Sequence, residues 1–575
     1  MIACVRRSLL WLLCGAVLLI APDALRAASP RDELLRFVPE DVGFCFIMQD
    51  LRVHAADLAD SPFVQQLRDS PVGTALQGSK ELGQLDQIDK SLRQSFGAGF
   101  DQLRDDLLGD AVVFAYRPGP PDKPDQEQGL ILVRARNAEV LASLVESINK
   151  TQKKDGSLTD LQACSYNGAT YFRRVEPHQT NYYAIRGPVL LFTGQEKLLQ
   201  QAIDVDRNAA ADAEPPLARR LREVGADKAA LALWVNPRAF DAGLEAKART
   251  AQGTDAALQQ KVLTYWKATD GVAAWATLDT ALHLSLAIRV RPNDLPPAAR
   301  RLFAAASRPS EAWRYFPDDA LIACGFRIDV GALVEVLQDL QSKDDASAAA
   351  NAFLGKDLIK DVLSHIGPDW GFCVMAPPAG SDGWLPEALI VVHIVRGDDA
   401  APVDEVLLST VHVAASWAVV NYNHDHPTQP VRLTATEYNK KEIHYLTGEG
   451  VFPVGVQPAY GLANGWLAFG SAPDVIRRFT DAKPKPPADD GSTFPLLRIS
   501  VKAWRAYIKD HRDPLTLALA ERNHLTPDEV RQGLDELLAA IQFVDRVEVN
   551  CRTGPGLTVL TLTVVTAQPL KRIHP

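Results

Sequence analysis

The sequence is poor in cysteine, in long apolar runs and in charge of one sign. It has seven cysteines in 575 residues, two of them in the first 27 residues. Such a sparse set excludes a disulfide framework. Cys45, Cys324 and Cys373 lie inside apolar runs, which predicts small buried side chains. The two others, Cys164 and Cys551, could form a disulfide, but nothing in the sequence selects that pair.

The charge balance excludes one class of partner. The formal net charge is −10, and it becomes −12 without residues 1–27, because that segment holds three Arg and one Asp (−10 − 2). Charges of both signs are interspersed along the chain, and the sequence has no long block of one sign. A protein that tracks phosphates needs a basic face, so we expect no nucleic-acid partner. The sequence identifies no other partner.

The one long apolar run lies near the N-terminus. It extends from Leu9 to Ala21, follows Arg6 and Arg7, and precedes small residues at 27 and 28. This is the layout of a secretory signal, and the run is shorter than the roughly 20 residues of a membrane-spanning helix. We therefore expect export to the periplasm, cell envelope or exterior, and no transmembrane segment in the mature chain. A retained membrane anchor is the alternative.

Familiar catalytic motifs are also missing. The sequence has no G-x-S-x-G elbow, no H-E-x-x-H zinc helix, no Walker-type phosphate loop and no paired C-x-x-C. We therefore assign no catalytic residue, no cofactor-binding residue, no cofactor and no metal ligand. A non-catalytic protein is favoured over an enzyme.

The sequence contains one pattern of residues that occurs twice. VPEDVGFCFIMQDLR at 38–52 and FPDDALIACGFRIDV at 316–330 both read as a turn, a buried strand and a helix start. Asp50 and Asp329 are predicted N-caps, since a carboxylate accepts the free amide hydrogens of a first helical turn.

Further segments correspond in the same order. LLGDAVVFAYRPG (107–119) corresponds to HIGPDWGFCVMAPPAG (365–380), and SYNGATYF from 165 to EYNKKEIHYL from 437. Asn167-Gly168 predicts a tight hairpin. The later matches are YAIRGPVLLFTG from 183 with YGLANGWLAFGS from 460, and ALALWVNPRAF (230–240) with LRISVKAWRAY (497–507). Each half closes with alternating strands, and in 281–290 this alternation places Leu282, Leu284, Leu286, Ile288 and Val290 on one face.

These correspondences predict an α+β fold made of two copies of a mostly antiparallel β-sheet unit packed with helices. The predicted boundaries are a signal peptide at 1–27, unit copies at 28–291 and 312–566, a Pro-rich linker at 292–311 and a C-terminal tail at 567–575. The residues that match between the copies are structural in type. Reactive residues mostly do not match, which favours a binding or structural module of the periplasm or cell envelope.

Two alternatives remain open. In NYNHDHPT (421–428) an extended segment would point His424 and His426 to the same side, and with Asp425 or His444 they would suit a metal-assisted hydrolase. The other alternative is a carrier of an apolar ligand, with a deep cavity lined by Leu, Val and Trp. Aromatic residues for either a core or a cavity are Trp234, Trp266, Trp275, Trp313, Trp370, Trp384, Trp466 and Trp504. The pairs Arg173-Arg174 and Arg477-Arg478 are expected on solvated faces.

The layout resembles a family. FVPEDVGFCFIMQDL, YFPDDALIACGF and RGPVLLFTGQEKLLQQAI are similar to segments of large secreted planctomycete-type proteins that carry an uncharacterised bacterial domain of unknown function. The resemblance implies export and a two-copy fold over most of the mature chain. It implies no activity, catalytic residue or cofactor.

Overall fold

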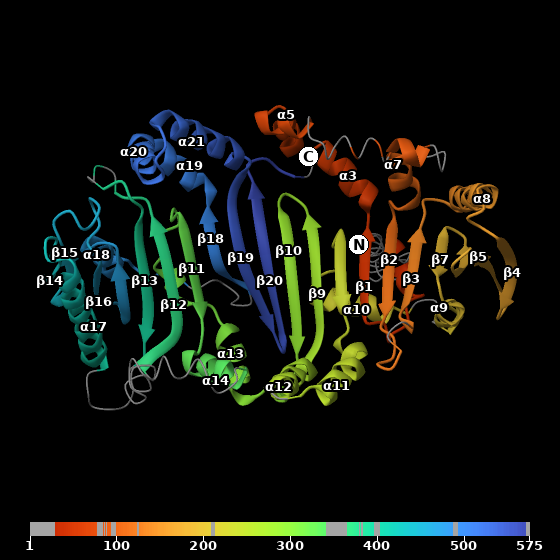
Figure 1. Ribbon diagram of the computed structural model, residues 1–575, viewed down its shortest axis with the longest axis horizontal. Helices are drawn as coiled ribbons and strands as arrows, with labels where there is room; N and C mark the ends of the chain where they lie inside the picture. The colour runs from red at the N-terminus through yellow and green to blue at the C-terminus, as the bar shows by residue number, and fades with distance from the viewer. Residues whose placement is uncertain are drawn as a thin grey trace, which may run out of the picture. The chain divides into compact units, whose positions relative to one another are not determined.

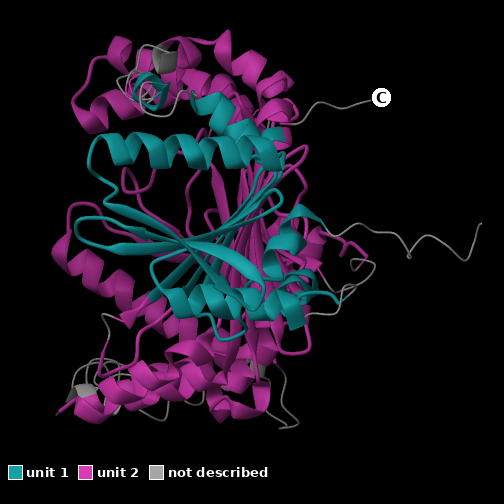
Figure 2. Cartoon of the chain, turned by 90° about the vertical axis from the view of Figure 1, so that its right-hand side faces the viewer, with its two compact units in different colours: residues 1–52, 89–116, 128–223 teal, residues 53–88, 117–127, 224–575 magenta. Residues whose placement is uncertain are grey.

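The computed structural model describes residues 29–77, 84, 87, 89–93, 99–123, 126–208, 213–252, 254–340, 365–378, 380, 383–395, 403–486 and 493–570. The chain divides into two compact units (Figure 2). Unit 1 consists of residues 1–52, 89–116 and 128–223, and unit 2 of residues 53–88, 117–127 and 224–575. The predicted signal peptide, residues 1–27, lies outside the described residues.

Unit 1 is built on an antiparallel sheet with the strand order β1–β2–β3–β7–β6–β5–β4. The strands are β1 (Phe44–Gln49), β2 (Ala111–Arg117), β3 (Gln128–Arg134), β4 (Asp160–Tyr166), β5 (Ala169–Val175), β6 (Thr180–Arg186) and β7 (Val189–Thr193). Its helices are α2 (Pro30–Leu35), α7 (Phe100–Gln102), the π-helix η1 (Leu103–Leu107), α8 (Ala138–Lys154), α9 (Glu196–Asn208) and α10 (Pro216–Val224). Figure 2 shows the sheet between helices on its two sides.

Unit 2 holds a larger antiparallel sheet with the order β8–β9–β10–β20–β19–β18–β11–β12–β13–β17–β16–β15–β14 (Figure 1). Its strands are β8 (Leu231–Val235), β9 (Thr269–Leu278), β10 (Leu282–Val290), β11 (Ile322–Arg327), β12 (Ile366–Met375), β13 (Glu387–Ile394), β14 (Arg432–Tyr438), β15 (Lys441–Thr447), β16 (Ala459–Ala463), β17 (Trp466–Gly470), β18 (Thr493–Ser500), β19 (Val544–Gly554) and β20 (Leu557–Thr566). The α+β fold class predicted from the sequence is confirmed.

The helices of unit 2 occur in several groups that lie between its strands in the sequence. They are α3 (Leu51–Ala59, which begins in unit 1), α4 (Pro62–Arg68), α5 (Pro71–Gln77), η3 (Pro237–Phe240), α11 (Asp241–Thr250), α12 (Thr254–Ala268), η4 (Pro292–Asp294), α13 (Pro297–Ala306), η5 (Glu311–Arg314), α14 (Val330–Leu340), α17 (Val403–Asp425), α18 (Pro473–Asp481), α19 (Val501–Asp510), α20 (Arg512–Asn523) and α21 (Pro527–Ile541). In the described residues no helix is both long and apolar enough to cross a membrane.

The strand order of unit 1 occurs again inside unit 2, where β11–β12–β13–β17–β16–β15–β14 follows the same sequence of connections. The registers agree as well. Phe172 lies opposite Tyr183 in the first sheet, and His444 lies opposite Tyr460 in the second. Tyr183 then pairs with Phe192, as Tyr460 pairs with Phe469.

Two hairpin turns illustrate the local physics. Asn167 (φ 49°) and Gly168 (φ 79°) form the turn between β4 and β5, which confirms the predicted hairpin, because both residues tolerate positive φ. In the matching turn Asn439 has φ 50° and Lys440 has φ 63°. Lys440 carries a Cβ atom where the first turn has glycine, so this second turn is the more strained of the two.

The turns are held by the same type of contact. The Tyr166 hydroxyl donates to Asp204 at 2.8 Å, and the Asn167 amide donates to the same carboxylate. In unit 2 the Tyr438 hydroxyl donates to Asp481 at 2.5 Å, and Asn439 contacts the same carboxylate at 3.4 Å. Each turn is thereby tied to the helix that follows its sheet, α9 or α18.

Three of the eight tryptophans named from the sequence are core residues. Trp234, Trp275 and Trp466 are buried, and the other five predicted from the sequence are half-buried. Trp466 packs under α18, whose Val475, Ile476 and Phe479 are buried. The five cysteines from Cys45 to Cys551 are all free thiols, so no Cys164–Cys551 disulfide is present.

Residues 292–311, the predicted linker, contain η4 and α13, because Pro297 can start a helix and the alanine-rich segment after it favours one. The predicted domain boundaries stay a prediction. One expectation differs from the structure. Arg174, predicted on a solvated face, is buried, and its guanidinium donates to Asn149 at 2.7 Å and to Glu176 at 2.8 Å. β10, at the end of the first predicted copy, pairs with β20, at the end of the second.

Candidate functional site

The most unusual surface of unit 2 is one face of its sheet. On β10, Leu284, Leu286 and Ile288 are 42%, 40% and 38% exposed, whereas Ser285 and Ala287 between them are 7% and 1% exposed. A half-covered antiparallel strand normally buries its apolar face and exposes its polar face. The polarity of β10 is therefore inverted.

The neighbouring strands continue the apolar face. Residues directly opposite each other in an antiparallel pair lie on the same face. Leu286 lies opposite Leu560 of β20 and Ala274 of β9, and Leu284 lies opposite Leu562 and Ala276. From Leu562 the row continues across β19, β18, β11, β12 and β13 through Val549, Leu497, Cys324, Phe372 and Ile390. Ile390 at the far end is 45% exposed. We call these residues, together with Leu286, Ile288 and Leu560, the open apolar face.

The chemistry of the open apolar face is limited to apolar contact. Its side chains are aliphatic or aromatic apart from Cys324, and burial raises the pKa of that thiol above its usual value. A neutral thiol in this setting is neither a strong nucleophile nor a metal ligand. The face can bind apolar groups, and it offers no acid, base or charge for catalysis.

Unit 1 exposes equivalent side chains on its own sheet. Phe46 and Ile131 are 39% and 38% exposed. Phe46 lies opposite Phe114, and Ile131 lies opposite Phe192. Each unit therefore leaves part of one apolar sheet face uncovered.

A histidine cluster lies beneath α17. The imidazole of His412 lies 3.1 Å from the hydroxyl of Tyr460, and the ring of His444 stacks on Tyr460 at 5.2 Å. Burial, and secondly the neighbouring His412, lower the pKa of His444, while Glu442 opposes this. Burial also raises the pKa of Tyr460 to about 12.

Unit 1 has a matching cluster without histidine. Asn149 of α8 donates to the Tyr183 hydroxyl at 3.0 Å, and Phe172 stacks on Tyr183 at 5.0 Å. The arrangement of helix, tyrosine and stacked ring is the same, although Asn and Phe replace the two histidines. The cluster therefore anchors a helix to a sheet, and its histidines need no catalytic role.

His424 and His426 do not form the site that the sequence suggested. The segment was expected to be extended, but α17 continues to Asp425, so neighbouring side chains point in different directions around a helix. His426 lies just beyond the helix end and stacks on Tyr422 at 4.3 Å. The buried His444 belongs to the cluster with His412. Across the described parts of the chain, no three His, Cys, Asp or Glu residues are grouped to hold a metal ion.

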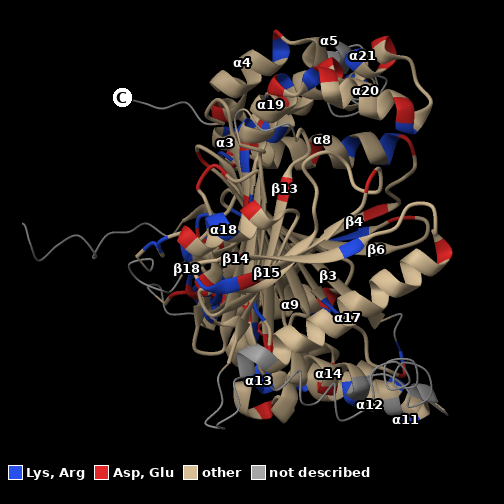
Figure 3. Cartoon of the chain, turned by 90° about the vertical axis from the view of Figure 1, so that its left-hand side faces the viewer, with Lys and Arg blue, Asp and Glu red and all other residues tan. Residues whose placement is uncertain are grey.

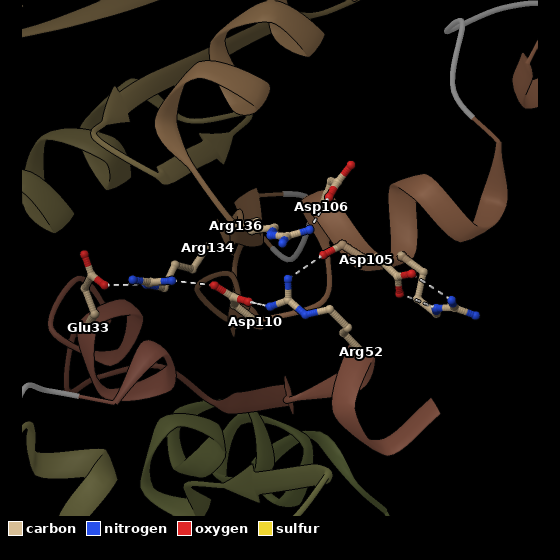
Figure 4. Close-up of polar contacts among 8 residues, drawn as sticks. Glu33, Arg52, Asp105, Asp106, Asp110, Arg134 and Arg136 are labelled. Carbon is tan, nitrogen blue, oxygen red and sulfur yellow. Dashed lines mark hydrogen bonds and ion pairs between the residues drawn. The ribbon is translucent and has the colours of Figure 1, made fainter. Parts of the chain in front are cut away.

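A charged network occupies one end of the sheet of unit 1 (Figure 4). Asp110 accepts hydrogen bonds from Arg52 and from Arg134, the latter at 2.5 Å, and Arg134 also bonds Glu33 at 2.7 Å. Nearby, the guanidinium of Arg104 lowers the pKa of Asp105. These carboxylates already have basic partners, which suits a network that fixes α2, α3 and the strand ends.

A pocket of 730 Å³ lies elsewhere in unit 2, beside α18. It is formed mainly by the loop between β15 and β16, including Phe452 and Val454, and by the loop before β13. Its Glu387 pairs with Arg478, and its Asp474 pairs with Arg477 at 2.8 Å. Unit 1 has only residues 176–179 between β5 and β6, so sequence comparison of the halves did not reveal this pocket.

Comparison with known proteins identifies a family. A family model described as "protein of unknown function (DUF3352)" matches residues 58–376, which is 319 of 575 residues (376 − 57). The chain belongs to this family. No curated protein and no solved structure shows significant similarity to the chain. The expected resemblance to a domain of unknown function is confirmed.

The DUF3352 match begins in α3 and ends directly after β12. It includes the exposed leucines of β8 and β10 and the open-face residues Cys324 and Phe372. The histidine cluster and all the residues that line the pocket lie outside it. Within this DUF3352 protein, the matched segment contributes to the open apolar face, and it also contains Asp105, Asp110 and Arg134 of the charged network.

Proposed function

We propose that this chain is an exported, non-catalytic binding module in which two copies of one α+β unit present an apolar sheet face to an apolar ligand. This proposal rests on the inverted polarity of β10, whose apolar face is exposed and whose opposite face is buried. Exposing three large aliphatic side chains while burying Ser285 is unfavourable in water unless a ligand covers the open face.

The duplication is supported by the shared strand order, the shared registers and the paired tyrosine–aspartate contacts. Insertions separate the halves at several points, yet Tyr183 and Tyr460 keep the same neighbours. The charged network of unit 1 is not repeated residue for residue among the described residues of unit 2. Pro368 stands at the position of Asp110, and the buried Asp369 next to it accepts hydrogen bonds from Ser310, from the Glu311 amide and from Arg327. The halves thus share residues that fold the chain rather than residues that react.

Export is supported by the sequence alone. Arg6 and Arg7, the apolar run from Leu9 and the small residues at 27 and 28 have the form of a cleaved signal. N-terminal sequencing of protein recovered from the producing cells is expected to give a first residue near 28. Recovery of the intact N-terminus would contradict cleavage without affecting ligand binding.

The ligand proposal is tested with mature protein and the fluorescent apolar probe N-phenyl-1-naphthylamine. We expect saturable binding that is lost in the double variant Leu284→Gln, Leu286→Gln. The matched control is Leu517→Gln on α20, a position that is 64% exposed and outside the face. Mass spectrometry of an organic extract should also release an apolar molecule. Absence of probe binding, or equal binding by all variants, would overturn the proposal.

A further inference from the structure

The solvent-facing side of α17 is a further apolar surface among the described residues. Val406, Val413, Trp417 and Val420 are 49%, 67%, 57% and 66% exposed. The opposite side of the helix packs on the sheet, where Leu407 is 2% exposed and contacts Ile394 and Leu467. Both sides of α17 are therefore apolar, although only one side has a place in the core.

The side chains on the solvent-facing side of α17 follow the spacing of a coiled-coil seam. Val406, Val413 and Val420 are seven residues apart, as are the half-buried Thr410 and the exposed Trp417 and His424. Taken together, the six residues are separated in turn by four and three residues, which is the spacing of d and a positions in a heptad repeat. The three valines occupy d positions, and the other three residues occupy a positions. We call these six residues the α17 seam, and at 1.5 Å per residue it is about 27 Å long.

The matching helix of unit 1 shows that the fold does not require an apolar solvent-facing side on this helix. α8 lies between β3 and β4, as α17 lies between β13 and β14. Its exposed residues include Glu139, Glu146, Lys150 and Lys153. A solvated helix at this place in the fold can thus be charged, and α17 has lost that character.

We propose that the α17 seam binds the α17 seam of a second copy of this chain, as an antiparallel helix pair. Between residues 406 and 423, α17 has no Asp, Glu, Lys or Arg, so two identical helices bring no like charges together along this stretch (Figure 3). The flanking positions outside the core are also uncharged, namely Ser409, Ala414, Ser416, Asn421 and Asn423. A helix that selects a different partner normally carries charges there.

The antiparallel orientation follows from side-chain size. It places Val413 of each copy against Trp417 of the other, and Val406 against His424. A parallel pair would instead place two Trp417 rings in one layer and two His424 rings in another. Antiparallel helices also oppose their dipoles favourably.

The composition of the helix argues against a membrane surface as the occupant. Helices that lie on membranes carry Lys and Arg on the polar face. Residues 403–425 contain neither. A seam of this length reaches at most the lower range of specific interfaces, about 1,000 Å², so we expect a reversible dimer with micromolar affinity. The proposal does not depend on the ligand of the sheet face.

The test is sedimentation velocity of the mature full chain in reducing buffer, from low to high micromolar concentration. We expect a concentration-dependent dimer. The single variants Val413→Lys and Trp417→Glu should each lose it, and an equimolar mixture of the two should regain it, because the introduced lysine of one copy would face the introduced glutamate of the other. The control Leu517→Glu on α20 should dimerise like the unchanged protein. Thermal melting should show all variants folded, since these side chains are exposed.

A monomer at every concentration would overturn the proposal, as would a dimer that neither variant affects. Failure of the mixture to dimerise would exclude the antiparallel register and with it the proposal. Flotation with phosphatidylcholine–phosphatidylglycerol vesicles provides the competing outcome. Binding to vesicles that Trp417→Glu abolishes, in a protein that stays monomeric, would assign the seam to a membrane.

Discussion

At the scale of residues, the tyrosines beside the two hairpins make a testable pair. Removing the hydroxyl in Tyr166→Phe or Tyr438→Phe deletes its hydrogen bond to Asp204 or Asp481. Each change should lower the free energy of unfolding, because the folded protein loses one hydrogen bond. Urea unfolding followed by tryptophan fluorescence measures this loss. An effect in one half only would show that the two contacts are not equivalent.

His444 should give unit 2 a dependence on pH. Its pKa in the folded protein is lowered, mainly by burial. The unfolded chain therefore binds the proton more readily, so the stabilising contribution is complete above the ordinary pKa of about 6.5 and declines as pH falls below it. The variant His444→Phe, which copies Phe172 of the other cluster, should lose less stability than the unchanged protein between pH 7 and pH 5.

The control for this prediction is His424→Gln, because His424 is exposed at the end of α17. It should keep the full pH dependence of unfolding. Melting temperatures measured across this pH range decide the matter. If His444→Phe retains the same slope, the titrating group is elsewhere.

Single residues were predicted well where the cause is local. The Asn167-Gly168 turn and the Asp329 N-cap, which accepts from Ala332 at 2.8 Å, both depend on neighbours in sequence. The burial of Arg174 was missed because its partners Asn149 and Gln152 come from a helix more than twenty residues earlier. Nothing in the local sequence indicates that contact.

At the scale of elements, α21 offers a clean test of helix capping. The Thr526 hydroxyl accepts the Glu529 amide at 3.3 Å, and the Glu529 carboxylate accepts the Thr526 amide at 2.8 Å. Thr526→Ala should cost about 1 kcal/mol. Thr264→Ala inside α12 is the matched control, since that hydroxyl bonds only a carbonyl of its own helix. It should be neutral or stabilising, and the same urea titration compares the two.

The sequence predicted the type of many helices and strands, but it did not predict which of their faces the rest of the chain covers. The alternation in residues 281–290 correctly grouped Leu284, Leu286 and Ile288 on one face. It could not tell which face the rest of the chain would cover, and the usual expectation would have buried the leucines. Similarly, residues 421–425 were expected to be extended, and Asn and Asp are poor helix formers, yet packing of α17 on the sheet carries the helix through them.

At the scale of the whole molecule, the junction of β10 and β20 joins the ends of the two predicted copies. Leu284 pairs with Leu562, and Leu286 pairs with Leu560, so equivalent apolar side chains meet across it. On the other face the hydroxyls of Ser285 and Thr561 lie 2.9 Å apart. The proposed binding face and a buried polar contact therefore share the same two strands.

This junction yields the last prediction. Ser285→Ala leaves the Thr561 hydroxyl without its partner and should cost about 1 to 2 kcal/mol, and Thr561→Val should cost a similar amount. The double variant should cost less than the sum, because no polar group is then left unpaired. The expected coupling is about 1 kcal/mol, obtained from urea unfolding of all four proteins. Since these side chains lie on the buried face, probe binding to the open apolar face should be unchanged. Additive costs would show that the two strands do not share this contact, and lost probe binding would show that the polar contact also shapes the open face.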